Sequence, residues 1–114
     1  MNLNTTHFVN MSQVVKKNHS YLQFLVTCPV HQRKLLLETA TPEQVHAIVQ
    51  AVHNICRGYI PLTNRENEIL LPFRDSIQDL EDPNIPYKKE KQILVQEGGS
   101  FVPDILIPFL SGLV

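Results

Sequence analysis

Two cysteine–histidine pairs have a spacing that a metal site could use. Cys28 lies three residues before His31, and His53 lies three residues before Cys56. Residues three apart share one side of a helix, and thiolates and imidazoles are preferred ligands of Zn²⁺. The alternative is a buried thiol beside an exposed histidine. It is favoured because Cys56 falls on the apolar stripe of its expected helix and His53 on the polar side. We therefore expect no metal and no cofactor.

No other arrangement of side chains predicts catalysis. The sequence contains no G-x-S-x-G, phosphate loop, dinucleotide fingerprint or H-E-x-x-H. His46 and His53 are seven residues apart on one helix face, where exposure to solvent explains them best. Carboxylate pairs such as Glu66 and Glu68 belong to an acidic run and predict surface charge. We expect a protein that is not an enzyme.

Positive charge occurs in short clusters that could contact phosphate. The net charge is −1, and residues 41–83 hold three arginines against seven carboxylates, a net −4. The candidate nucleic-acid contacts lie on either side of this acidic segment and are Arg33, Lys34, Lys88, Lys89 and Lys91. Clusters of this size are more often solvated helix faces than phosphate sites. DNA binding is therefore a possible but weakened function.

The apolar periodicity predicts an all-α bundle of four to five short helices in one domain. The first helix runs from residue 12 to the residue before Pro29, and the second covers residues 31–40. In the second, Leu35 and Leu36 are expected to face inward and Arg33 outward. Residues 1–10 have no sustained period and are expected to be frayed, so the bundle is assigned to residues 11–97.

Three further helices follow, each with a start or stop signal. The third begins at a capping box formed by Thr41 and Gln44, and Gly58 is placed to end it. The fourth follows Thr63, and Pro72 is expected to kink it or break it in two. The fifth covers residues 86–97.

Gly98 and Gly99 join this bundle to an apolar C-terminal tail, so residues 98–114 are assigned as a hinge and tail. Gly98 is expected to end the fifth helix. The tail is too short, and too interrupted by prolines, to cross a membrane. It either folds back as a last helix on the bundle or docks onto another chain. The candidate docking and self-association residues are Phe101, Ile105, Leu106 and Phe109.

Three stretches of the sequence resemble a family of short open reading frames from Polinton or Maverick elements and adintoviruses. They are HQRKLLLETATPEQVHAIVQAVHNICRGYIPLT, LLPFRDSIQDL and KKEKQILVQEGGSFVPDIL. The resemblance covers roughly Pro29 to Leu110. That family has been likened to the adenovirus core protein X, the precursor of the mu peptide, through a shared pair of glycines and an apolar tail that contains proline.

The resemblance implies a virion-associated core or minor capsid-like protein, derived from a virus or transposon, that acts by binding DNA, a capsid protein or both. The alternative is a helical protein-interaction or self-association module in which the acidic middle has abolished DNA binding. Either way we expect a homo-oligomer. Two distant cysteines and the lack of a signal peptide predict an intracellular protein, in the virion or in the nucleus or cytoplasm of an infected cell.

Overall fold

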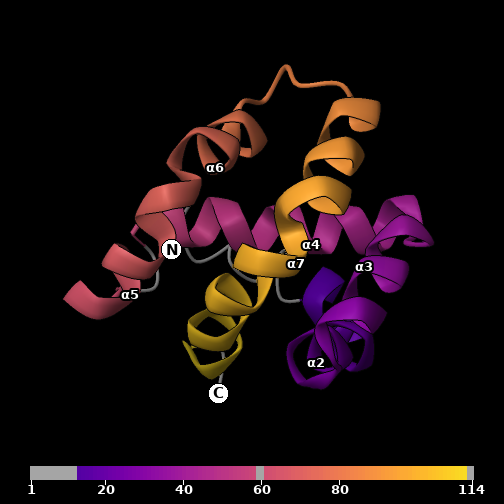
Figure 1. Cartoon of the computed structure of the whole chain (residues 1–114), viewed down its shortest axis with the longest axis horizontal. Helices are drawn as coiled ribbons and strands as arrows, with labels where there is room; N and C mark the ends of the chain where they lie inside the picture. The colour runs from indigo at the N-terminus through magenta and orange to yellow at the C-terminus, as the bar shows by residue number, and fades with distance from the viewer. Residues whose placement is uncertain (1–12, 59–60, 113–114) are drawn as a thin grey trace.

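The computed structural model describes residues 13–58 and 61–112, and these residues form helices and no strand (Figure 1). Residues 13–17 are helical. They are followed by α2 (His19–Thr27), α3 (Val30–Glu38), α4 (Pro42–Cys56), α5 (Asn64–Leu70), the 3₁₀ helix η1 (Leu71–Phe73), α6 (Arg74–Glu81) and α7 (Tyr87–Gly112). The predicted small all-α bundle is confirmed. The predicted frayed segment, residues 1–10, lies outside the described residues.

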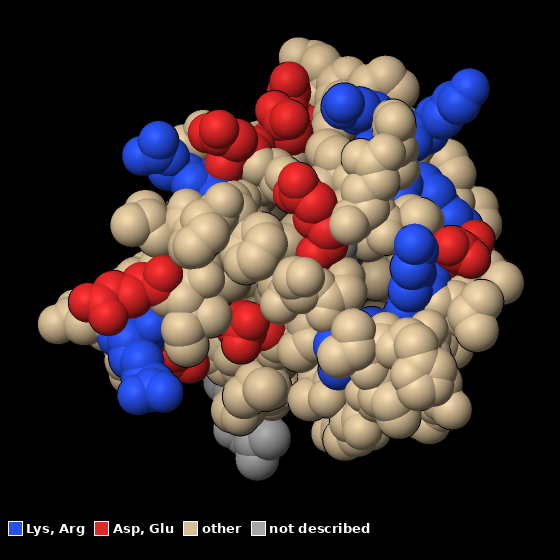
Figure 2. All heavy atoms as spheres, in the orientation of Figure 1, with Lys and Arg blue, Asp and Glu red and all other residues tan. Residues whose placement is uncertain are grey.

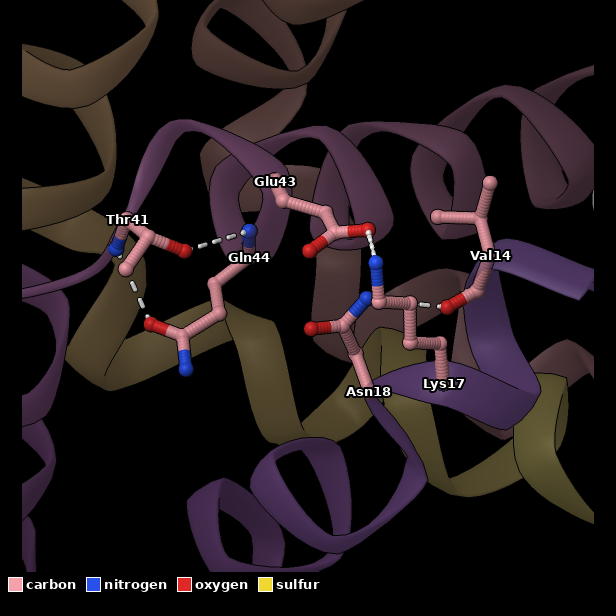
Figure 3. Close-up of polar contacts among 6 residues, drawn as sticks. All are labelled: Val14, Lys17, Asn18, Thr41, Glu43 and Gln44. Carbon is pink, nitrogen blue, oxygen red and sulfur yellow. Dashed lines mark hydrogen bonds and ion pairs between the residues drawn. The ribbon is translucent and has the colours of Figure 1, made fainter.

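The long helix α4 is the centre of the fold. It begins as predicted, because the Thr41 hydroxyl accepts from the backbone of Gln44 at 3.1 Å and the Gln44 side chain accepts from the backbone of Thr41 at 2.9 Å (Figure 3). This pairing uses backbone donors that would otherwise lack partners at a helix start. Gly58 follows the helix with φ +75° and ends it, as expected. The buried face is almost entirely aliphatic and consists of Val45, Ala47, Ile48, Val49, Ala51, Val52 and Ile55.

The first predicted helix is interrupted at Asn18. The side-chain amide of Asn18 donates to the carbonyl of Val14 at 3.0 Å, in competition with the regular backbone ladder (Figure 3). Beside it, Lys17 pairs with Glu43 of α4 at 3.1 Å. The interruption separates α2 from the helical residues 13–17, and the single helix expected up to Pro29 is therefore wrong in this detail.

The predicted break at Pro72 is confirmed. Proline lacks the N–H that a continuing α-helix needs, and the chain passes through η1 between α5 and α6. Phe73 of η1 packs on Phe101, with ring centroids 5.6 Å apart. The break therefore places an aromatic ring against the C-terminal part of the molecule.

Helix α7 runs from Tyr87 to Gly112, but it changes direction at Gly98, where a helix end and a hinge were predicted. It continues as two arms, Tyr87–Glu97 and Gly99–Ser111, that meet at a bend of 100° (Figure 1). Among the described residues no single helix is long and apolar enough to span a membrane, and the two arms of α7 meet that test, by length and composition only, as a bent pair. The glycine pair is thus a corner within a helix.

The second arm of α7 packs into the core. Its buried side chains, each at most 1% exposed, are Phe101, Val102, Ile105, Leu106 and Phe109. The four residues predicted to form an exposed docking patch are among them, so that prediction is wrong. The physical reason is that a small domain needs this apolar area to complete its own core. The expected alternative, a last helix packed on the bundle, describes the arrangement.

Candidate functional site

Among the described residues, the guanidinium of Arg33 donates three hydrogen bonds to backbone carbonyls inside the protein. Arg33 lies on α3 and is 8% exposed. Its Nε donates to the carbonyl of Leu25 at 2.6 Å, Nη2 to the carbonyl of Cys28 at 3.0 Å, and Nη1 to the carbonyl of Gly99 at 2.8 Å. One side chain therefore joins the end of α2 to the corner of α7.

Two of these carbonyls lack a helical donor because of proline. In an α-helix the carbonyl of residue i accepts from the N–H of residue i+4, and proline has no N–H. Pro29 follows Leu25 by four residues, and Pro103 follows Gly99 by four. A buried carbonyl without a donor costs about 1–3 kcal/mol. Arg33 supplies the missing donors at both places.

The same side chain also faces a carboxylate on the second arm. Burial raises the pKa of Asp104, and the positive charge of Arg33 opposes that rise. Arg33 was predicted to contact nucleic acid, and this prediction is wrong, because its donors are used on backbone carbonyls inside the protein. We refer to Arg33 with the carbonyls of Leu25, Cys28 and Gly99 as the arginine clamp.

Burial of Arg33 sets the rotation of α3. Residues two positions apart on a helix point about 200° away from each other. With Arg33 inside, Leu35 must face outward, and it is 59% exposed, while Leu37 is 1% exposed. The predicted orientation, with Arg33 outward and Leu35 inward, is reversed.

Leu35 forms part of a shallow groove of about 370 Å³ between α2 and α3. Its lining residues are Phe24, Gln32, Leu35, Leu36 and Thr39, which we call the α2–α3 face. Phe24 is 50% exposed across the groove from Leu35. The hydroxyl of Thr39 already donates to the carbonyl of Leu35 at 2.9 Å. The face is therefore mostly apolar.

The two helices of this face are fixed to each other. Beside the arginine clamp, the Tyr21 hydroxyl of α2 donates to the carbonyl of Leu36 at 3.1 Å. Burial, and to a lesser extent the nearby Cys28, raises the pKa of Tyr21 to about 12, so the donor stays protonated at neutral pH. A face held in this way needs little reorganisation to bind a partner.

The four lysines predicted to contact phosphate differ in their exposure to solvent. Lys91 donates to the carbonyl of Ala40 at 2.6 Å and is partly buried, whereas Lys34, Lys88 and Lys89 are exposed. Carboxylates gather over α6, and lysines and arginines are more frequent toward α3 and the first arm of α7 (Figure 2). A role for the three exposed lysines stays a prediction.

The four residues considered for zinc do not come together. The Cys28 thiol is buried and contacts the carbonyl of Leu25, His31 is exposed, and the His53 ring is 3.2 Å from the carbonyl of Leu80. Among residues 13–58 and 61–112, no group of three or more histidine, cysteine or acidic side chains could hold a metal ion. The zinc alternative is therefore contradicted.

A second groove, also of about 370 Å³, lies between the end of α4 and the pair α5 and α6. Cys56 and Glu81 are on its lining, with Ile105 of the second arm. Burial and the neighbouring Glu81 raise the pKa of Cys56 to about 11. The thiol is therefore protonated at neutral pH and is a weak nucleophile.

Comparison of the chain with known protein families, curated proteins and solved structures finds no match.

The sequence contained one overlooked signal for the α2–α3 face. Pro29 and Pro103 each leave a carbonyl without its donor, and Arg33 is a long side chain with several donors near the first of them. A prediction that Arg33 is buried, made on this ground, would have implied that Leu35 faces outward.

Proposed function

We propose that this chain is a protein-interaction module, not an enzyme, that docks through its α2–α3 face. The observation that carries the proposal is the joint exposure of Phe24 and Leu35, 50% and 59%, on the two sides of one groove. Isolated apolar residues on a surface are ordinary, but apolar residues grouped around a concave site are typical of binding surfaces.

The resemblance to the element-encoded family suggests the setting. A virion-associated, core or minor capsid-like protein would use this face to bind a capsid protein or another copy of itself. Large aromatic and aliphatic side chains that are already ordered are suited to act as anchors in such contacts.

A protein partner is favoured over DNA because two of the basic residues already donate hydrogen bonds within the chain. Of the five proposed phosphate contacts, Arg33 is buried in the arginine clamp and Lys91 is held by Ala40. Affinity for DNA depends on the number of phosphates that basic side chains neutralise. The three exposed lysines that remain, together with the acidic segment of residues 61–86, make a weak DNA-binding surface. DNA binding is therefore the weaker alternative.

The test compares two exposed leucines. Binding of the purified chain to an immobilised second copy of itself and to purified capsid proteins encoded in the same genome is measured for wild type, Leu35→Glu and Leu71→Glu. Leu71 is 62% exposed and lies outside the α2–α3 face, so it is the matched control. We expect Leu35→Glu to lose binding by at least about tenfold and Leu71→Glu to retain it.

Equal binding by wild type and Leu35→Glu would overturn the proposal. Binding to a 30-base-pair duplex, measured in parallel at about 50 mM and 200 mM salt, checks the alternative. If the chain binds the duplex tightly and binds neither a second copy nor a capsid protein, DNA is the partner and the α2–α3 face is not the functional surface.

A further inference from the structure

We infer that the partner of the α2–α3 face is the same face of a second copy of this chain, with the two α3 helices antiparallel across a two-fold axis. This inference rests on the proposed function and names its partner. It requires a face that attracts its own copy, and both the charge and the geometry of α3 meet that requirement.

Charge separates this face from the acidic segment of the chain. The segment from residue 61 to residue 86 holds two arginines against six carboxylates, so its copies repel one another. The described residues up to 58 hold five basic against two acidic side chains. In contrast, α2 carries no charged residue, and the surface over it is uncharged at the lower right of Figure 2. Like-charge repulsion therefore opposes contacts between two copies of the acidic segment, whereas the five residues that line the α2–α3 face carry no charge.

The charges that flank Leu35 are self-complementary. Lys34 and Glu38 are four residues apart on α3 and lie on the same flank of the helix. Both are exposed, and neither forms an ion pair within the part of the chain that the structure describes. Each is therefore available to a partner.

A two-fold axis perpendicular to α3, at the level of Leu36, pairs these charges. In antiparallel helices related by such an axis, residue 34 of one copy lies at the height of residue 38 of the other, on the same side. Lys34 of each copy then meets Glu38 of its mate, giving two ion pairs at the edge of the contact. The two Leu35 side chains meet at the centre, where solvent is excluded.

The experiment measures the mass of the full chain by sedimentation equilibrium over a range of concentrations. We expect wild type and Leu71→Glu to dimerise. We expect Leu35→Glu to remain a monomer with the same helix content and, at a concentration too low for association, the same urea midpoint. Each single charge reversal, Lys34→Glu or Glu38→Lys, replaces two attractive pairs by two repulsive ones and should weaken the dimer about tenfold. The double variant Lys34→Glu/Glu38→Lys should restore it, because the pairs form again with exchanged signs.

A monomeric wild type at all concentrations would overturn the inference, as would a dimer that Leu35→Glu leaves intact. A double variant as weak as the single ones would overturn the antiparallel arrangement. The proposed function fails separately, only if Leu35→Glu weakens binding to neither a second copy nor a capsid protein. Binding of a capsid protein that depends on Leu35, by a chain that never dimerises, would keep the function and reject the second copy as partner.

Discussion

The second arm of α7 and the α2–α3 face differ in a way that the sequence does not suggest. The second arm belongs to the most apolar stretch of the chain, yet Phe101 and Phe109 are fully buried. Helix α3 is polar on average, yet it exposes Leu35 beside Phe24 of α2. Apolar composition therefore does not identify the docking surface. The exposure of an apolar side chain depends on which other residues are buried in the core.

Arg33 connects the two regions. It donates to Gly99 at the corner from which the second arm enters the core, and its burial turns Leu35 to the surface. Proline is the chemical cause, because Pro29 and Pro103 leave carbonyls that need a donor from another part of the chain. The interior of the molecule and its proposed docking surface thus share one determinant.

The largest expected effect follows from removing the clamp. Arg33→Met removes the donors that reach the carbonyls of Leu25, Cys28 and Gly99, although Leu25 keeps a contact with the Cys28 thiol, and should lower the free energy of unfolding by about 3 kcal/mol or more. The matched control is Lys34→Met, next to it on the exposed side of α3, which should change the value by less than about 0.5 kcal/mol. Urea unfolding measures both. If the two variants were equally stable, Arg33 would not be a clamp.

An effect of comparable size distinguishes the two apolar regions directly. Phe101→Ala removes a ring that is 0% exposed and should destabilise the protein by about 3–5 kcal/mol. Phe24→Ala removes a half-exposed ring and should cost about 1 kcal/mol in the monomer. Urea unfolding at a concentration too low for association provides the comparison. A larger loss from Phe24→Ala would mean that the assignment of core and surface is inverted.

The smallest effect concerns the link between α2 and α3. Burial raises the pKa of Tyr21 from 10.0 to about 12 in the folded protein. Below pH 10 the hydroxyl is protonated in both states, and between pH 10 and 12 the unfolded chain releases its proton first. Stability should therefore fall as the pH rises through this window.

Tyr21→Phe is the control for this titration. It loses the hydrogen bond to the carbonyl of Leu36, about 1 kcal/mol at neutral pH. It should also lack the part of the alkaline decline that belongs to Tyr21, which is read from the difference between the two unfolding curves. Parallel curves for wild type and Tyr21→Phe from pH 10 to 12 would contradict the burial of this hydroxyl.

The elements that local chemistry specifies were predictable. The capping box at Thr41, the helix end at Gly58 and the break at Pro72 each depend on residues within a few positions of one another. The buried stripe of α4 follows from its helical periodicity. Such features need no knowledge of distant contacts.

The rotation of α3 and the course of α7 were not predictable in this way. The bond from Arg33 to Gly99 joins residues 66 positions apart, and an arginine is rarely buried unless its donors are satisfied. The bend of α7 lies at Gly98, the predicted helix end, but the packing of the second arm into the core depends on contacts with distant residues. The orientation of Arg33 and the burial of the second arm are both set by contacts across the bundle, and together they moved the candidate docking surface from the tail to α2 and α3.

The most direct test of this account is hydrogen exchange at the arginine side chains, followed by NMR. The chain has four arginines, and Arg57, Arg65 and Arg74 are exposed. The account predicts one slowly exchanging Nε–H signal, assigned by its loss in Arg33→Lys, because this group donates to the carbonyl of Leu25 in the interior. If the Nε–H of Arg33 exchanges as fast as those of the other three, Arg33 is not buried, and nothing turns Leu35 outward.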